Sequence, residues 1–350
     1  MRLAIVCNNY GQKYDGIGSF AKILNENYSD DIKSSVFSAD CLSETSALKK
    51  VFNFGMIRAF RAVRRAVKNR QVDAVLIEYP FVEWNPFIVT EIKKLRRKAK
   101  KNDVKIFASV HEYERVNFLR KLVIKRIVKY SDVIFVSDES TKNLLSKFNR
   151  KIYTRSIPSN IQSKKDIDAE LKCRNDYAYF GLVNSAKAFD EMIKAWDEFN
   201  INNRNTLYVL TASKLEGLED NHKNVKYCYC YSDEQIAEIM LKCTFCILPI
   251  KPEIDNKNGT FKTSCIFGCL AIGHFCSGYS DLPFIIDLEN YSVADFVDAL
   301  NNSQMFNDLQ IKGLSVEAVN FSKRFMPEQI AKDVAEIMLE ELNIKNWSKI

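Results

Sequence analysis

The chain has 350 residues, of which 47% are hydrophobic and 27% charged, with a formal net charge of +7. This length favours two domains over one, and the hydrophobic content suffices for two packed cores. No run approaches the roughly 20 apolar residues of a membrane-spanning helix, so we do not expect an integral membrane protein. The first residues, MRLAIVCNNYG, lack the features of a signal peptide, so we expect a cytoplasmic chain.

Strands and helices are predicted to alternate through the first half of the chain. The predicted strands are Arg2–Cys7, Asp73–Tyr79, Val104–Val110 and Val133–Val136. The predicted helices are Gly18–Asn27, Ile57–Lys68, Pro86–Lys101, Asn117–Tyr130 and Asp138–Phe148. Because the strands are almost continuously apolar and separated by helices, they favour a doubly wound parallel sheet.

A second alternating series follows a polar stretch. Residues Ser163–Asn175 lack apolar periodicity, so we expect a linker there. The predicted strands beyond it are Tyr177–Phe180, Thr206–Leu210 and Val225–Cys230, and the predicted helices are Ala186–Phe199, Ser232–Leu241 and Pro327–Leu342. The fold class is therefore α/β with two Rossmann-like domains, at 1–162 and 163–326. A last helix follows at 327–350, and packing back on the first domain is one option for it.

The segment Ile247–Gly273 is the most informative stretch for function. A buried strand ending at Pro249 leads into a polar loop with Glu253, Asp255, Asn258 and Gly259, and a helix starts at Thr260. Free backbone N–H groups and the positive end of the helix dipole suit a phosphate. The upstream carboxylates are placed to hold sugar hydroxyls. An ordinary strand–helix turn is the alternative.

Three other segments are candidate sites. The loop from Asn9 to Gly18 carries Gly16 and Gly18, which permit close approach of a ligand, but it is too long for a dinucleotide-binding turn. His111 follows a strand directly, where ligands of doubly wound sheets bind, and capping is its alternative role. Gly181 and Lys187 lie at a strand–helix turn, where Lys187 is either a phosphate ligand or a solvated lysine.

The positive charge is concentrated in the first half of the chain. Through Lys165 there are 33 Lys and Arg against 16 Asp and Glu, and in the remainder 18 against 28. The cations gather in Ile57–Lys68, Lys93–Lys101 and Arg115–Lys129, and each is worth about 1 kcal/mol near an anionic bilayer. We therefore expect the first domain to bind an anionic membrane surface. Nucleic acid is not expected, because aromatic side chains do not interleave with these cations.

The ten cysteines are mostly embedded in apolar runs and are expected to be reduced and structural. The pairs Cys228/Cys230 and Cys243/Cys246 have spacings that invite a zinc interpretation. No histidine lies near either pair, so no metal is expected.

Taken together, these features resemble the GT-B glycosyltransferases, and within them family 4 of the bacterial surface-polysaccharide type. The resemblance rests on the Gly16–Gly18 loop, on His111, on the turn Ile157–Asn160 and on Gly181–Lys187. It further rests on the acidic stretch, in which the family has two glutamates eight residues apart. Here those positions hold Asp255 and Thr263, and the arginine that usually follows the family's glycine is replaced by Leu182.

The resemblance implies a nucleotide-diphosphate sugar as donor, linked to UDP or GDP, with no cofactor and no metal. It implies catalytic roles for His111, Lys187 and Asp255. The implied donor-binding residues are Gly181, Lys187, Glu253, Asp255, Asn258, Gly259, Thr260, Lys262 and Thr263. The implied acceptor-binding residues are Asn9, Gly16, Gly18, Tyr113 and Arg115.

The expected reaction is transfer of the sugar, with retention, to a lipid-linked glycan at the inner face of the cytoplasmic membrane, in surface polysaccharide synthesis. Preorganised donors around the diphosphate would stabilise the leaving group. Two alternatives stay open. One is an NAD-type oxidoreductase that uses Gly16–Ala21 as its fingerprint, and the other is a non-catalytic basic protein that binds nucleic acid or membranes.

Overall fold

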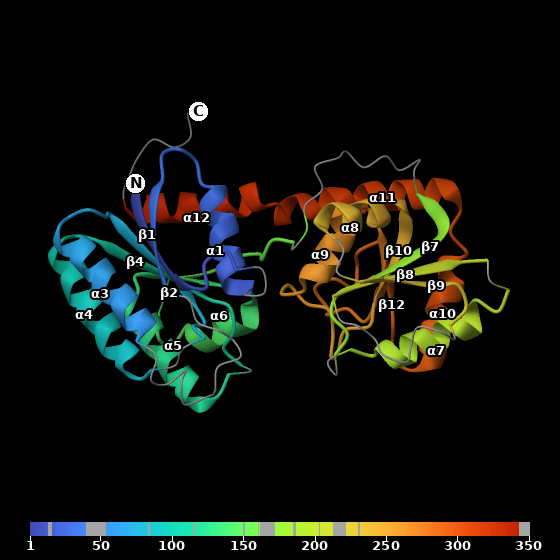
Figure 1. Cartoon of the computed structure of the whole chain (residues 1–350), viewed down its shortest axis with the longest axis horizontal. Helices are drawn as coiled ribbons and strands as arrows, with labels where there is room; N and C mark the ends of the chain where they lie inside the picture. Colours follow the sequence, from blue (N-terminus) through green and yellow to red (C-terminus); the bar gives the residue numbers. More distant parts are fainter. Residues whose placement is uncertain are drawn as a thin grey trace. The chain divides into compact units, whose positions relative to one another are not determined.

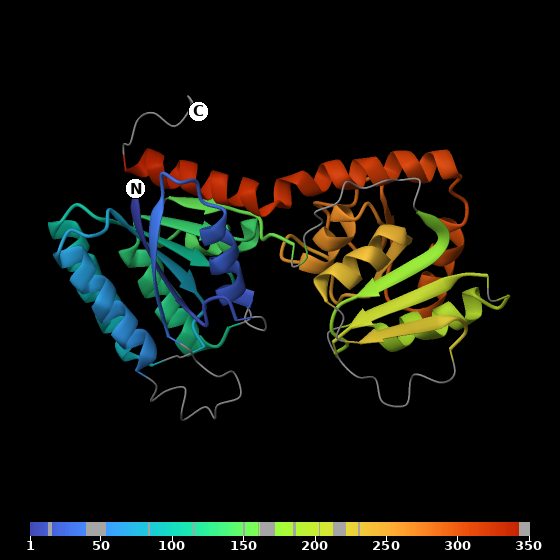
Figure 2. The ribbon, with the colours of Figure 1, turned by 45° about the horizontal axis from the view of Figure 1, so that its top comes forward.

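A computed structural model divides the chain into two compact units, each with its own parallel sheet (Figures 1 and 2). Unit 1 comprises residues 1–157 and 327–350, and unit 2 comprises residues 158–326. The structure describes residues 1–12, 16–39, 54–82, 85–114, 116–149, 151–159, 161, 172–184, 187–202, 204–212, 222–229 and 232–342.

The sheet of unit 1 has the strand order β2-β1-β3-β4-β5-β6, and every described pairing is parallel. Its strands are β1 (Arg2–Asn8), β2 (Lys33–Ala39), β3 (Ala74–Tyr79), β4 (Lys105–Val110), β5 (Val133–Val136) and β6 (Ile152–Thr154). The central strands are buried along nearly their whole length, as the continuous apolar runs predict.

Helices cover both faces of this sheet (Figure 1). They are α1 (Gly16–Glu26), α3 (Gly55–Lys68), α4 (Phe87–Lys101), α5 (Phe118–Tyr130), α6 (Glu139–Leu145) and α12 (Pro327–Glu341). Apolar side chains of α3, α4 and α5 share one core with Ala4 and Val6 of β1 and with Val75, Ile77 and Tyr79 of β3. Helices α1 and α12 pack on the opposite face, where Val334 and Met338 of α12 are fully buried.

The sheet of unit 2 has the order β12-β11-β10-β7-β8-β9 and is likewise parallel. Its strands are β7 (Cys173–Phe180), β8 (Thr206–Thr211), β9 (Val225–Tyr229), β10 (Cys243–Leu248), β11 (Leu270–Gly273) and β12 (Ile285–Asp287). Its helices are α7 (Phe189–Phe199), α8 (Asp233–Lys242), α9 (Gly259–Ile266), α10 (Val293–Ser303), α11 (Asp308–Ser322) and η2 (Lys323–Phe325).

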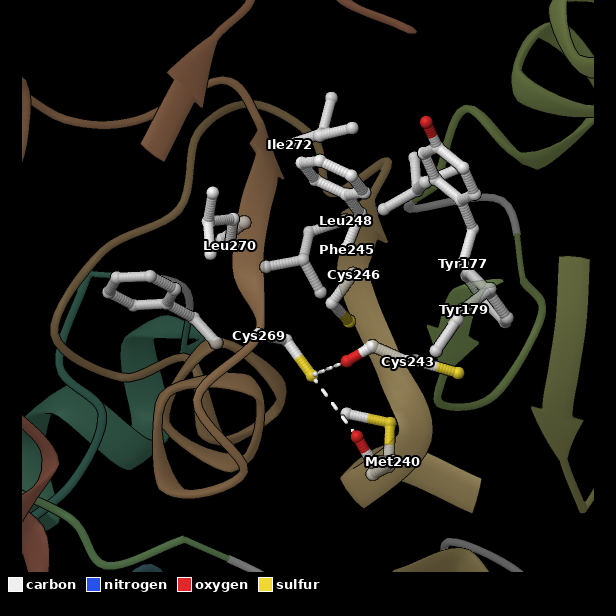
Figure 3. Close-up of a cluster of buried hydrophobic side chains, with 14 of the residues drawn as sticks. Tyr177, Tyr179, Met240, Cys243, Phe245, Cys246, Leu248, Cys269, Leu270 and Ile272 are labelled. Carbon is white, nitrogen blue, oxygen red and sulfur yellow. Dashed lines mark hydrogen bonds between the residues drawn. The ribbon is translucent and has the colours of Figure 1, made fainter. Parts of the chain in front are cut away.

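The core of unit 2 is aromatic at its centre and carries several cysteines (Figure 3). The ring of Tyr177 stacks on Phe245 with centroids 4.9 Å apart. The thiol of Cys269 donates to the carbonyls of Cys243 and Met240 at 3.3 and 3.5 Å (Figure 3). Burial raises the pKa of the Cys243 and Cys269 thiols, so both stay protonated and pack as small apolar groups.

The described part of the chain contains no helix that is both long and apolar enough to cross a bilayer. It likewise contains no group of three or more His, Cys, Asp or Glu side chains arranged to hold a metal ion.

The fold class predicted from the sequence is confirmed, while several strands were not predicted. The strands that were not predicted are β2, β6, β11 and β12. Strands β2, β6 and β12 lie at sheet edges, and β11 has only four residues. Most of the predicted linker, residues 163–171, lies outside the described residues, and strand β7 begins at Cys173, inside the predicted linker.

Candidate functional site

The predicted phosphate site is in unit 2, where Gly181 brings three segments together. Gly181 follows β7 with φ +133°, a conformation that side-chain-bearing residues rarely adopt. A Cβ atom at this position would lie 2.6 Å from Nζ of Lys187 and 3.6 Å from Oγ1 of Thr260. The lysine and the first turn of α9 therefore converge on the glycine, as the sequence predicts for a phosphate site.

Backbone contacts to the end of β10 fix the position of Lys187. Lys187 forms an isolated bridge with Ile250, and the N–H of Ala188 donates to the carbonyl of Pro249 at 2.8 Å. The ammonium donates to the hydroxyl of Tyr179 at 3.0 Å and lies 4.9 Å from the centre of that ring. The cation is thus anchored by an aromatic side chain that the sequence analysis did not single out.

The ammonium of Lys187 is half-buried. No carboxylate in the described residues forms an ion pair with Lys187, and burial lowers the pKa of its ammonium to about 8. Burial without a counter-ion disfavours the charged form, and a nearby anion would reverse that effect. A half-buried cation beside a glycine turn is therefore suited to an anion.

The first turn of α9 supplies neutral donors to the same place. Asn258 caps the helix, and its side chain accepts from the N–H of Phe261 at 2.8 Å. The N–H groups of Gly259 and Thr260 have no hydrogen-bond partner within the described residues. Two open N–H groups at a helix N-terminus, next to a cation, are suited to a phosphate.

The acidic loop before α9 is held in part by contacts within the loop and with the core. Ile254 anchors it in the core, and the carboxylate of Asp255 accepts from the N–H of Lys257 at 2.9 Å. Glu253 is exposed and Asp255 is half-buried. Both acids therefore remain accessible beside the helix that carries Gly259 and Thr260.

Two of the predicted donor-binding side chains lie in the interior. Lys262 is fully buried and its ammonium donates to the carbonyl of Asn256 at 2.5 Å. Thr263 is fully buried, and its hydroxyl bonds the carbonyl of Gly259 at 2.9 Å and the hydroxyl of Ser159 at 2.7 Å. The expectation that these side chains face a ligand is corrected: burial makes them supports of the α9 turn.

In unit 1, His111 belongs to a buried cluster of three charged or titratable side chains. Glu78 of β3, His111 after β4 and Arg155 after β6 all lie near the carboxyl ends of neighbouring or near-neighbouring strands. Nε2 of His111 is 2.9 Å from Oε2 of Glu78, and Nη2 of Arg155 donates to the same oxygen at 3.1 Å. Phe20 of α1 packs edge-on against the imidazole, with centroids 4.9 Å apart.

The charges within this cluster balance. Burial alone would raise the pKa of Glu78, but Arg155 and His111 outweigh it and hold the pKa near 2. The guanidinium of Arg155 packs over Phe20 at 4.4 Å, and its Nη1 has no partner within the described residues. Neither Glu78 nor Arg155 was singled out from the sequence, because each lies far along the chain from His111.

The remaining predicted acceptor residues are mostly structural in their contacts. Asn9 is 2% exposed with φ +52°, and a Cβ at Gly18 would lie 1.9 Å from its carbonyl oxygen. Gly18 therefore serves close packing of α1 on the loop after β1, whereas Gly16 faces open space. Tyr113 is 8% exposed within the core of α3, α4 and α5. Arg115 lies outside the described residues.

The basic helices α3 and α4 meet at a buried acid. Glu91 is 3% exposed and pairs with Lys94 at 3.0 Å and with Arg64. A surface hollow of about 520 Å³ beside them is lined by cations alone: Arg64, Lys94, Arg97, Lys98, Lys100 and Lys101. The exposed rings of Phe54 and Phe87 line a second hollow next to it. Aromatic and basic side chains are thus neighbours here, although they are separated in the sequence.

Comparison with solved structures gives whole-chain matches. An α-glucosyltransferase in complex with UDP and a 13-mer DNA is 12% identical, with a TM-score of 0.64, over 98% of this chain and 99% of that one. HepE of Anabaena in complex with UDP is 10% identical, with a TM-score of 0.64, over 97% and 100%. A glycosyltransferase from Rickettsia africae is 12% identical, with a TM-score of 0.65, over 99% of both chains.

No family model matches the sequence, and no curated protein is significantly similar to it. The DNA-bound α-glucosyltransferases overturn one expectation. Because proteins of this same fold are found in complex with DNA, the exclusion of nucleic acid as a partner was wrong. The two parallel sheets with their flanking helices match the GT-B glycosyltransferases throughout, so the chain has the GT-B fold.

Proposed function

We propose that the protein is a glycosyltransferase that uses a nucleoside diphosphate sugar as donor, and that unit 2 binds the donor. The observation that carries this proposal is the convergence of Lys187, Gly181 and the open N–H groups of Gly259 and Thr260. A half-buried cation without a counter-ion and a helix N-terminus together satisfy a diphosphate. The UDP-bound structures of the same fold support this choice of ligand.

Each group then has a defined task. Lys187 and the α9 amides hold the diphosphate and stabilise the charge that develops on the leaving group when the bond to the sugar breaks. Asp255 and Glu253 lie upstream of the same turn and accept hydrogen bonds from sugar hydroxyls. We propose retention at the anomeric carbon and no required metal, in line with the family that the sequence resembles.

For the acceptor we propose a lipid-linked glycan in surface polysaccharide synthesis, bound by unit 1. The support is the sequence resemblance and the polar carboxyl edge of the unit 1 sheet around His111. Since an α-glucosyltransferase of this fold is found in complex with DNA, acceptor assays should include duplex DNA beside the glycan. Transfer to DNA alone would replace the glycan in this proposal.

The test of the donor site is thermal stabilisation by nucleotides, measured on the wild type and on Lys187→Ala. UDP at 100 times its Kd should stabilise the wild type by about 2.7 kcal/mol, and this gain should vanish in Lys187→Ala. Lys194→Ala is the matched control, because Lys194 is exposed on α7 in the same unit. Stabilisation by GDP and not by UDP would make the proposed donor a GDP-sugar. Stabilisation by NAD, with none by UDP or GDP, would instead favour the oxidoreductase alternative.

A further inference from the structure

We propose that Glu78 and Arg155 are positioning residues for His111, which they hold with its proton on Nε2, so that Nδ1 accepts a hydrogen bond from a sugar hydroxyl of the substrate. This inference rests on the proposed function for the identity of the ligand. Its structural part, the protonation pattern of the imidazole, stands on the geometry of unit 1 alone.

The proton on Nε2 follows from the partners of that nitrogen. Glu78 is fully buried and accepts a hydrogen bond from Nη2 of Arg155 at 3.1 Å. Its carboxylate is therefore ionised and only accepts hydrogen bonds. A nitrogen 2.9 Å from an ionised oxygen must donate, since two lone pairs would repel. Nη2 of Arg155 also lies 3.4 Å from Nε2 of His111. Because both nitrogens are then donors, this contact is not a hydrogen bond.

The imidazole itself is neutral, which leaves a lone pair on Nδ1. Burial lowers the pKa of His111, and the nearby guanidinium of Arg155 lowers it further, while Glu78 and Glu112 act in the opposite sense. No hydrogen bond to Nδ1 forms within the described residues. A neutral imidazole whose Nε2 donates can only accept through Nδ1, so it recognises a donor such as a hydroxyl.

The surroundings of His111 fix the ring in one orientation. The backbone N–H of His111 donates to the carbonyl of Tyr79 at 3.2 Å, and the backbone carbonyl of His111 accepts from the hydroxyl of Ser137 at 3.2 Å. Phe20 packs against the ring from α1, and Arg155 packs over Phe20. Together with Glu78, these contacts hold the imidazole from three strands and one helix. A side chain held in this way can orient a substrate hydroxyl.

The protonation pattern can be read directly from imidazole nitrogen shifts of ¹⁵N-histidine-labelled protein, because the chain has only three histidines. His222 and His274 serve as internal references. Their Nδ1 atoms lie 2.6 Å from Asp197 Oδ2 and from the carbonyl of Leu288. His111 should show a protonated Nε2 and a bare Nδ1, whereas the other two should carry a proton on Nδ1. Replacing each histidine by glutamine assigns the signals.

The positioning role is tested with Glu78→Gln and with the double variant Glu78→Gln/Arg155→Met. The double variant removes both charges at once, so it leaves no unpaired buried charge if the single variant fails to fold. UDP release from UDP-glucose in the presence of a lipid-linked glycan acceptor should slow about 100-fold in kcat. UDP-induced stabilisation should be unchanged, because the acceptor binds in unit 1 and the donor diphosphate in unit 2. Asp197→Asn removes the carboxylate of another carboxylate–histidine pair, and its turnover should equal that of the wild type.

The outcomes separate this inference from the proposed function. A proton on Nδ1 of His111, or an unchanged kcat in the double variant, would overturn the positioning role even if UDP binds and is released. Absence of UDP release in the wild type would count against the proposed function instead. The nitrogen shifts would then still show whether Glu78 and Arg155 set the imidazole's protonation.

Discussion

At the scale of single residues, Gly181 is the position where the smallest change should have the largest effect on ligand binding. In Gly181→Ala, the new methyl group would lie 2.6 Å from Nζ of Lys187 and would force the lysine away from the α9 turn. We expect UDP affinity to fall at least tenfold, measured by titration calorimetry, with a loss of stability of about 1–2 kcal/mol from the strained backbone.

Gly313→Ala provides the control for this substitution. Gly313 lies in α11 of the same unit, and a Cβ there meets nothing within 4 Å. The alanine should leave UDP affinity unchanged and stabilise the helix by up to about 1 kcal/mol. Equal UDP affinity in Gly181→Ala and the wild type would remove this turn from the donor site.

The depressed pKa of Lys187 predicts a pH dependence of donor binding. Burial lowers this pKa from its ordinary value to about 8, so the free protein loses the charge as the pH rises through 8. UDP affinity should therefore be constant between pH 6.5 and 7.5 and fall toward tenfold per pH unit above 8. In Lys187→Arg, whose guanidinium does not titrate in this range, the residual affinity should show no such fall. The measurement is titration calorimetry from pH 6.5 to 9.

The sequence identified residues that follow strands, but not the residues that hold them. Lys187, Gly181 and the Gly259–Thr260 turn each carry a local signal, namely a glycine or a helix start after a buried strand. Glu78 and Arg155 carry no such signal. Glu78 does interrupt the apolar strand AVLIEY next to its end, and that buried acid was the available clue. Its partners were not predictable, since they depend on strand order.

At the scale of secondary-structure elements, the start of α1 depends on Gly18. A Cβ there would lie 1.9 Å from the carbonyl oxygen of Asn9, which is part of the backbone and cannot move aside easily. Gly18→Ala should destabilise unit 1 by about 2–3 kcal/mol or more, measured by chemical denaturation. Gly16→Ala, two residues earlier in the same helix, meets nothing within 4 Å and should change stability by less than about 1 kcal/mol. Similar losses in both variants would contradict this account of α1 packing.

Strands with long apolar runs were predictable, whereas the edge strands β2, β6 and β12 were not. Strands such as β3 and β10 read as continuous apolar runs because helices cover both faces of their sheets. Strand β2, KSSVFSA, lies at a sheet edge, and its positions are exposed or only partly buried, so its composition resembles that of a loop. Strands β6 and β12 have three residues each, too few for a period of two to show.

At the scale of the whole molecule, the chain forms two compact units, and unit 1 is built from two separate stretches of the sequence. Helix α12 follows unit 2 in the chain but buries its apolar side chains in unit 1. The sequence predicted a last helix and left open whether it crosses back to the first domain, because apolar side chains on a helix can pack on either sheet. The charge division does follow the chain: the basic helices α3, α4 and α5 all belong to unit 1.

This arrangement predicts that the two units respond to different perturbations. Met338 in α12 is fully buried against the unit 1 sheet, so Met338→Ala should cost about 2–5 kcal/mol and lower the melting temperature of unit 1. UDP should raise the melting temperature of unit 2 alone, which identifies that transition in a calorimetric scan. Met305→Ala is the control, because Met305 is 77% exposed and its removal should change stability by less than about 0.5 kcal/mol. If Met338→Ala lowered the transition that UDP raises and left the other in place, α12 would belong to the donor unit instead.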